Sequence, residues 1–278
     1  TTITVSQAGN NLYNAATDVN QTQVVLTAIS KWTFDAITTT GSGSNVSVTG
    51  SAVADQGLQT SGSLFSANHA SSSTVWSNPS GNGSAKSVSS TFWAVGDYWQ
   101  FKLNTSNYHT LAIAVDQTGS STGPSTFKIQ YSTNGTSYTD LPGGTYTLDA
   151  TGWSTSNYRS AAVRSFDLSS ITTLNNKSAV YIRLVDANTT SIGNGTVATG
   201  GSSRVDNFVI TGIACNTIAG ITNNTNTNVL TCDTATIALT ATGGTSYSWS
   251  NGTNVVGTSE NLSVTAAGTY TVTVTSAN

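Results

Sequence analysis

Residues 98–103 read YWQFKL, and this hexapeptide carries the pattern that decides the fold class. Its apolar residues Trp99, Phe101 and Leu103 alternate with polar or amphipathic ones. Successive side chains of a β-strand point to opposite faces of the sheet, so this segment has one apolar and one polar face. Such a strand is typical of a sheet that packs one face on a hydrophobic core.

The same alternation recurs up to residue 210. It predicts further strands at residues 23–29, 31–37, 111–116, 127–132, 180–186 and 205–210. The pair Asn134-Gly135 separates two runs and predicts a hairpin, because a type I′ turn needs positive φ at both central positions. No stretch has a helical period. Polar, Gly/Ser/Asn-rich loops are predicted around residues 41–90 and 187–203.

These patterns predict an all-β protein whose residues 1–212 form one antiparallel, jelly-roll-like β-sandwich. Side chains from several of the runs are expected in its core: Trp99, Phe101, Ile113, Ile129, Ile182 and Phe208.

Composition agrees with this and limits the partners. Charged residues make up 8% of the chain, against about 25% in an average soluble domain. Ser, Thr, Asn and Gly are poor in helix interiors. The 6 Trp, 10 Tyr and 7 Phe residues argue against disorder. With a net charge of −3, the chain is not expected to have the positively charged surface that binds nucleic acid. No apolar run is long enough for a membrane span.

The chain begins at Thr1 and contains no Met. A cleaved export signal would leave such a chain, and so would an excised fragment. We expect a secreted protein located at the extracellular cell surface.

A second, smaller module is predicted at residues 232–278, after a polar linker at residues 213–231. Its short strand runs are IALTATG (237–243), SYSWSNG (246–252), NLSVTA (261–266) and GTYTVTVTSA (268–277). A hairpin is expected at Asn251-Gly252. This spacing is typical of an immunoglobulin-like sandwich.

The paired segments YSWSNG and AGTYTVTVT resemble the PKD/Ig-like repeats of large surface proteins of Bacteroidota, including gliding-motility adhesins. The resemblance implies a spacer or adhesive module, with Trp249 in the core and Tyr270 on the strand facing it. Residues 116–141 and 200–212 resemble a jelly-roll domain of secreted bacterial proteins. That domain occurs in adhesins, nucleases and glycan-active enzymes alike, so it implies architecture rather than function.

Catalysis is not expected. The two histidines, His69 and His109, have no triad-like neighbours in the sequence, and Glu260 is the sole Glu. Nucleophilic catalysis needs a base within hydrogen-bond reach, and glycosidases need paired carboxylates.

A structural Ca²⁺ is the candidate cofactor, because hard cations prefer carboxylate and carbonyl oxygens. By analogy with other β-sandwiches, Asp35 and Asp206 are the candidate ligands. In the alternative, Asp206 caps backbone amides of the Gly-rich loop before it, and Arg204 pairs with a carboxylate such as Asp116.

Glycan binding would use exposed aromatic rings. Trp76 and Trp153 lie in loop-like contexts and are the candidates, with burial under their own loops as the alternative. Trp32, Trp93, Trp99 and Trp249 lie in strand-like runs and are expected in cores.

The two cysteines, Cys215 and Cys232, are predicted to form a disulfide, with two buried thiols as the alternative. Asp233-Thr234-Ala235 resembles the O-glycosylation motif that Bacteroidota use on exported proteins, which makes Thr234 a candidate site.

Two functions remain. The first is a non-catalytic surface protein, either a segment of an adhesin or a subunit of an extracellular fibre, whose partners are other copies of itself or neighbouring repeats. The alternative is a glycan-binding module of a larger secreted enzyme. The small module is expected to have an open sheet edge, and residues 1–7 (TTITVSQ) form a short alternating strand suited to pair with such an edge.

Overall fold

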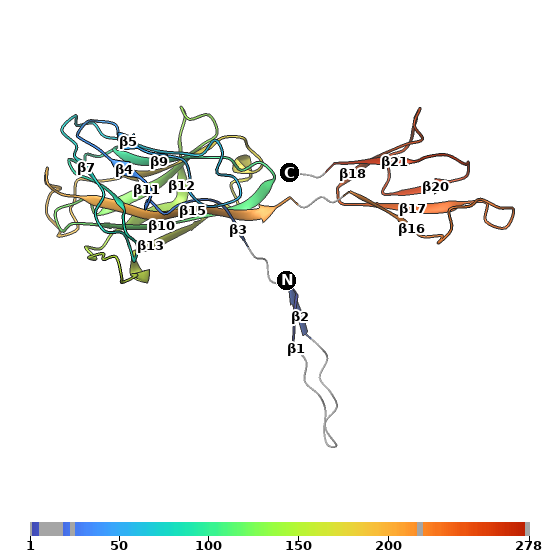
Figure 1. Cartoon of the computed structure of the whole chain (residues 1–278), viewed down its shortest axis with the longest axis horizontal. Coiled ribbons are helices and arrows are strands. Elements are labelled where there is room, and N and C mark those ends of the chain that lie inside the picture. Colours follow the sequence, from blue (N-terminus) through green and yellow to red (C-terminus); the bar gives the residue numbers. More distant parts are fainter. Residues whose placement is uncertain (1, 6–18, 23–25, 216–218, 276–278) are drawn as a thin grey trace, which may run out of the picture. The chain divides into compact units, whose positions relative to one another are not determined.

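The computed structural model describes residues 2–5, 19–22, 26–215 and 219–275. These residues form β-strands, turns and loops, with two short 3₁₀ helices, η1 (Ser160–Ala162) and η2 (Thr172–Leu174). The predicted all-β fold class is confirmed. The chain divides into two compact units, residues 1–213 (unit 1) and 214–278 (unit 2), which are described separately below (Figure 1).

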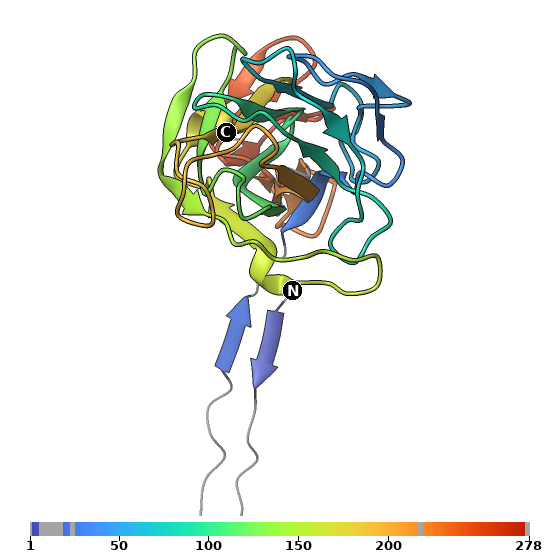
Figure 2. The same cartoon turned by 90° about the vertical axis from the view of Figure 1, so that its left-hand side faces the viewer.

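Unit 1 is a sandwich of two antiparallel sheets (Figures 1 and 2). The six-stranded sheet contains, in spatial order, β13 (Val163–Asp167), β10 (Tyr108–Gly119), β15 (Ser203–Ala214), β8 (Val88–Ser90) and β7 (Trp76–Ser77), with β3 (Thr27–Trp32) also paired to β15. The five-stranded sheet contains β12 (Thr139–Thr147), β11 (Thr126–Ser132), β14 (Val180–Asp186), β9 (Tyr98–Leu103) and β6 (Leu64–Asn68). From β6 to β15, consecutive strands cross between the sheets as in a jelly roll, except for the hairpins β7–β8 and β11–β12.

Two short strands, β4 (Thr38–Thr39) and β5 (Val48–Thr49), form a separate ribbon in the long loop region. At the N-terminus, β1 (Thr2–Val5) and β2 (Val19–Thr22) form an antiparallel hairpin. Among the described residues, this hairpin pairs with no other strand.

The core of unit 1 lies between the two sheets. On β9, Trp99, Phe101 and Leu103 are fully buried, and the ring of Phe101 stacks on Phe208 of the opposite sheet at a centroid distance of 3.6 Å. The six predicted core residues are all buried. The alternation in the sequence identified them because strand geometry sends every second side chain to the same face.

The first predicted strands need correction. Residues 23–25 lie outside the described residues, and β3 ends at Trp32, so the strand predicted at residues 31–37 is wrong beyond that residue. Phe34 has φ +59° and is followed by a turn. Its ring is nevertheless buried, 5.0 Å from that of Phe65. β3 ends two residues before Phe34, and the left-handed backbone of Phe34 still leaves its ring in the core. The sequence therefore has an apolar residue at the position that strand alternation would give, although the chain there forms no strand.

The hairpin at Asn134-Gly135 joins β11 to β12 as predicted, but through a longer loop. Gly135 has φ +75°, whereas Asn134 has no positive φ. The Asn134 side-chain oxygen instead accepts the backbone N–H groups of Thr136 and Ser137, both at 2.9 Å. The expected type I′ turn is therefore replaced by a loop that the Asn side chain organises.

Unit 2 is a small immunoglobulin-like sandwich of two three-stranded sheets. One sheet has the order β16 (Gly220–Asn223), β17 (Ile237–Thr242), β20 (Asn261–Val264). The other has the order β19 (Val255–Gly257), β18 (Ser246–Ser250), β21 (Thr271–Thr275), and β21 lies against β17. Trp249 is fully buried between the sheets.

β16 corrects the prediction of a linker at residues 213–231. This strand pairs with β17 along its whole length, from Gly220 opposite Thr242 to Asn223 opposite Leu239. The sequence predicts a linker there because an edge strand of a small sandwich buries little side-chain surface, so most of its residues can be polar.

Among the described residues, no helix combines the length and the apolar character that a membrane crossing requires.

Candidate functional site

His69 lies in a buried cluster that brings it next to Ser90 and Asp97. Its Nδ1 atom is 3.3 Å from Asp97 Oδ2, and its Nε2 atom is 3.4 Å from Ser90 Oγ. All three residues are buried. Sequence reasoning missed the cluster, because no local pattern connects His69, which follows β6, with Ser90 at the end of β8 and Asp97 just before β9.

The order of these groups is that of a Ser-His-Asp triad, but their surroundings do not suit catalysis. The His69 ring lies 4.2 Å from the ring of Trp93 and 4.9 Å from that of Trp76. Burial lowers the pKa of His69 to about 4, so the imidazole is neutral at pH 7. No part of Ser90 is exposed to solvent. The cluster therefore supports a structural role.

Asp186 extends this cluster as an incompletely satisfied buried carboxyl. Its backbone N–H donates to the Asp97 carbonyl at 2.9 Å, while its Oδ2 atom has no hydrogen-bond partner among the described residues. Burial raises its pKa to about 7, and the nearby Asp97 carboxylate acts in the same direction. Burial also raises the pKa of Asp97. Unit 1 therefore contains carboxyl groups whose charged forms are unfavourable.

A second buried cluster surrounds Asp206, the predicted metal ligand. Asp206 Oδ2 accepts the backbone N–H of Asn82 at 2.8 Å and the hydroxyl of Ser84 at 2.7 Å. Its Oδ1 accepts the Asn207 N–H at 2.8 Å. Gly81 has no room for a side chain there, because a Cβ would collide with Ser84 Oγ and Asp206 Oδ2.

In this structure the Asp206 oxygens accept hydrogen bonds from two backbone N–H groups and from the Ser84 hydroxyl, and Ca²⁺ binding by Asp35 and Asp206 stays a prediction. Asp35 is exposed and accepts the Lys86 N–H at 2.8 Å. The two carboxylates thus hold the same loop, and no group of three His, Cys, Asp or Glu residues lies together in the described part of the chain. We assign Asp206 a role as an amide cap, although the loop it caps is residues 82–84 and not the one before it.

Asp116 lies beside Asp206 and does not pair with Arg204 in an ion pair. Its Oδ2 accepts the side-chain amides of Asn82 at 3.0 Å and Asn207 at 3.1 Å. Burial raises the pKa of Asp116, and burial raises that of Asp206 to about 6. This pair is a second set of carboxyl groups whose ionisation the fold opposes.

The predicted glycan-binding tryptophans are not exposed. Trp76 is 4% exposed, and its indole N–H donates to the Gly43 carbonyl at 2.9 Å. Trp153 is 8% exposed. The alternative of burial is therefore correct for both rings, and the bond to Gly43 shows that a segment distant in sequence lies against Trp76. Trp32, Trp93, Trp99 and Trp249 are buried as expected.

The predicted disulfide is absent. Cys215 follows β15 and is half-buried, Cys232 lies in an exposed bend before β17, and both are free. Their short separation in sequence suggested a bond, but it does not determine where the two segments lie. Thr234 sits in a turn in which its N–H donates to Thr231 Oγ1 at 2.9 Å, and its modification stays a prediction.

The outer face of the five-stranded sheet carries a strip of aromatic and polar side chains, here called the tyrosine strip: Tyr98, Gln100, Tyr138 and Arg183. The Arg183 guanidinium lies 3.7 Å from the ring centroid of Tyr98 and 3.5 Å from that of Tyr138. Gln100 Oε1 accepts hydrogen bonds from Arg183 Nε and the Tyr138 hydroxyl, both at 2.8 Å. These residues are half-buried, so the strip is partly accessible to a ligand.

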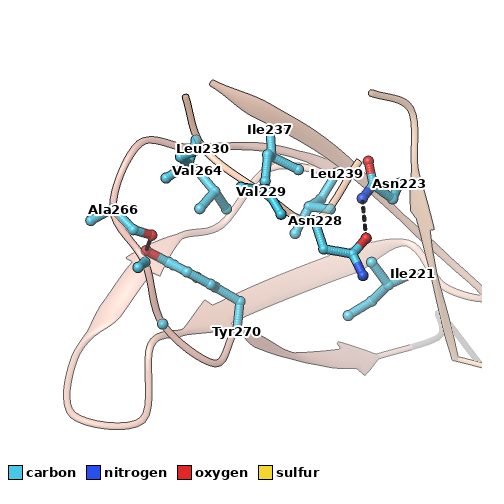
Figure 3. Close-up of a pocket in the computed structure, with 12 residues that line it drawn as sticks. Ile221, Asn223, Asn228, Val229, Leu230, Ile237, Leu239, Val264, Ala266 and Tyr270 are labelled. Atoms are coloured by element: carbon cyan, nitrogen blue, oxygen red, sulfur yellow. Dashed lines mark hydrogen bonds between the residues drawn. The ribbon is translucent and has the colours of Figure 1, made fainter. Parts of the chain in front are cut away.

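Unit 2 has an open side. A hollow of about 470 Å³, here called the groove, is lined by uncharged residues of β16, β17, β20 and the loops beside them (Figure 3). Tyr270 borders it just before β21, and its hydroxyl donates to the Ala266 carbonyl at 3.1 Å. Two apolar lining residues are exposed to solvent, Ile221 by 45% and Val229 by 62%.

No protein-family model and no curated protein matches the chain. Among solved structures it is similar to a domain of bacteriophage CBA120 tailspike protein 4, with 9% identity, 55% of this chain and 20% of that chain covered, and a TM-score of 0.33. It is also similar to TmCBM61, solved with β-1,4-galactotriose, with 10% identity, 54% of this chain and 88% of that chain covered, and a TM-score of 0.29. For the K2 adhesin domain of Lys-gingipain, the identity is 13%, the match covers 54% of this chain and 98% of that chain, and the TM-score is 0.30. The chain spans only a fifth of the tailspike chain, and similarities this distant assign neither a family nor a function.

Proposed function

We propose that this chain is a non-catalytic structural or adhesive protein of the extracellular cell surface, a segment of an adhesin or a subunit of a fibre. The observation that carries the proposal is the open side of unit 2. There the groove is lined by β16, β17, β20 and the loops beside them, with Tyr270 at its border just before β21. In the described part of the chain, β21 pairs only with β18.

An unpaired strand edge is a template for another strand, and a neighbouring apolar groove can take that strand's side chains. Charged residues are rare in this chain, so strand association there removes few charges from water. In unit 1, by contrast, Ser90, His69 and Asp97 are buried, and the rings of Trp76 and Trp93 pack against His69. Both features favour a protein that acts through surface contact.

Self-association of the 278-residue chain tests this proposal. We expect the mean mass, measured by light scattering, to rise with protein concentration. Ile221→Lys should raise the dissociation constant at least about tenfold, because the incoming strand must bury an unpaired ammonium group. Val255→Lys is the matched control, since Val255 is 65% exposed on β19 and does not line the groove. The proposal would be contradicted if Ile221→Lys, Val255→Lys and the wild type all self-associated with the same dissociation constant.

Glycan binding by the tyrosine strip is the second candidate function. Half-exposed tyrosine rings beside an amide and a guanidinium offer both stacking and hydrogen bonds to a sugar. We expect Tyr138→Ala to weaken oligosaccharide binding about tenfold in calorimetric titrations, with Trp76→Phe as a control outside the strip. If a glycan array detects no binding to the wild type, this function is excluded.

A further inference from the structure

We infer that the partner of the open side is a second copy of this chain, whose hairpin β1–β2 adds to the free edge of β21 and places aliphatic side chains of β1 in the groove. The inference rests on the proposed function, because it names the strand that the open edge receives. It concerns a contact that joins the N-terminal hairpin of one copy to unit 2 of another.

The described part of unit 2 has six strands arranged as in an immunoglobulin-like sandwich, one fewer than the seven of the constant-type fold. Tyr270, at the start of β21, donates its hydroxyl to the backbone four residues upstream, at Ala266. This is the tyrosine corner that marks strand F of such folds. In the complete fold, strand G continues the sheet beyond F. In the described part of unit 2, no strand occupies that place.

The facing sheet shows the consequence. β21 lies against β17, whereas β16, the next strand of that sheet, has no strand over it among the described residues. Ile221 of β16 is therefore 45% exposed although its neighbour opposite on β17, Ala241, is fully buried. A strand paired to β21 would cover β16 and exclude water from Ile221.

The groove has the size and chemistry for such a strand. Its volume of about 470 Å³ is roughly three times that of a ~150 Å³ cavity that holds a benzene ring. Figure 3 shows Ile221, Leu239 and Val264 around the opening, with Tyr270 on its other side. None of the lining residues is charged. Several aliphatic side chains therefore fit without a charge being buried.

The hairpin β1–β2 matches this site. β1 pairs with β2 along one edge, and among the described residues its other edge is free. The sequence of β1, TITV, alternates threonine with aliphatic residues as TVTVT of β21 does. Four residues extend over about 13 Å and five over about 17 Å, so the two strands have similar lengths. Threonine pairs and aliphatic pairs across strands stabilise a sheet.

Addition of the hairpin converts the three-stranded sheet β19-β18-β21 into a five-stranded sheet shared by two copies. A two-stranded hairpin is marginally stable alone, and pairing would stabilise it. The two contacting surfaces are different, so the contact is head-to-tail. Repetition of such a contact generates a ring or an open filament.

The test compares two double variants of the 278-residue chain. Ile3→Lys with Val5→Lys places charges on the β1 residues that alternate with threonine, and we expect the dissociation constant for self-association to rise at least about 100-fold. Thr2→Lys with Thr4→Lys adds the same charge to the same strand on its other face, and we expect a change below about threefold. Ile3→Val with Val5→Ile keeps both residues aliphatic and should associate like the wild type.

Hydrogen exchange of the associated wild type gives a second readout, in which the amides of both β1 and β21 become protected. Loss of association in Ile221→Lys but not in Ile3→Lys/Val5→Lys would overturn the inference and leave the proposed function standing. A wild-type chain that remains monomeric at all concentrations would overturn both. Equal loss in the two β1 double variants would also overturn it, since added charge alone would then explain the effect.

Discussion

Replacing Trp249 by alanine will unfold unit 2 and leave unit 1 folded. The side chain is fully buried, and its indole N–H donates to the Ser259 carbonyl at 2.9 Å. Within the described part of unit 2, the other buried apolar residues are Ile237, Ala241 and Val264. Truncation of a buried aromatic costs about 3–5 kcal/mol, which is close to the total stability of so small a domain.

Trp249 is the single tryptophan of unit 2, so the loss is easy to follow. Differential scanning calorimetry of the wild type should show transitions for both units, and that of Trp249→Ala should retain only the transition of unit 1. Limited proteolysis should then cleave within residues 219–275. Trp249→Phe, which keeps an aromatic ring, should retain both transitions. Survival of the unit 2 transition in the alanine variant would show that the core does not depend on this residue.

Unit 1 will be more stable in mild acid than at slightly alkaline pH. The folded-state pKa values of Asp186, about 7, and Asp206, about 6, lie above the unfolded value of 3.8. Each group therefore contributes stability that is complete below about pH 4 and is lost as the pH rises through its folded pKa. His69 acts in the opposite direction, because its pKa falls from 6.5 to about 4 and its contribution is lost as the pH falls between these values.

The carboxyl groups outweigh the histidine. Between about pH 8 and pH 5, Asp186 gains about 3 kcal/mol and Asp206 about 1 kcal/mol, while His69 loses about 2 kcal/mol. The net gain of about 2 kcal/mol corresponds to a rise in Tm of about 4–8 °C for a domain of this size. Thermal melts of unit 1 across this pH range measure it directly.

Asp186→Asn should reverse this pH dependence, because the gain of about 1 kcal/mol from Asp206 and the loss of about 2 kcal/mol from His69 leave a net loss of about 1 kcal/mol between about pH 8 and pH 5. It should also raise Tm at the alkaline end, since it removes a buried carboxylate with an unpartnered oxygen. Asp140→Asn is the control. The Asp140 side chain is 57% exposed, and its hydrogen bonds to Gln130 and Lys128 lower its pKa. That variant should keep the acid preference of the wild type. A melting temperature that rises steadily towards pH 8 would refute the assignment of Asp186 as a destabilising charge.

The sequence by itself determined the all-β class and the core of unit 1. Trp99, Phe101, Ile129 and Phe208 could be assigned to the interior because the two-residue repeat of a strand is a local property of the backbone. Trp249 in unit 2 was identifiable for the same reason. Where one residue broke the local geometry, as Phe34 does with φ +59°, the same pattern predicted a strand that does not exist.

Only the tertiary structure decided which distant residues meet. Asp206 caps the backbone N–H of Asn82 across 124 positions of sequence, and Ser90 faces His69 across 21. Trp76 is covered by a loop that contains Gly43, so its surroundings cannot be derived from its neighbours in the chain. Non-local pairing also decided that the polar segment of β16 is a strand and not a linker. It decided as well that one side of Ile221, beside the groove, is left exposed to solvent. Side-chain alternation records which way a residue points, whereas burial and binding depend on which other segments fold over it, and this requires non-local pairing of strands and loops.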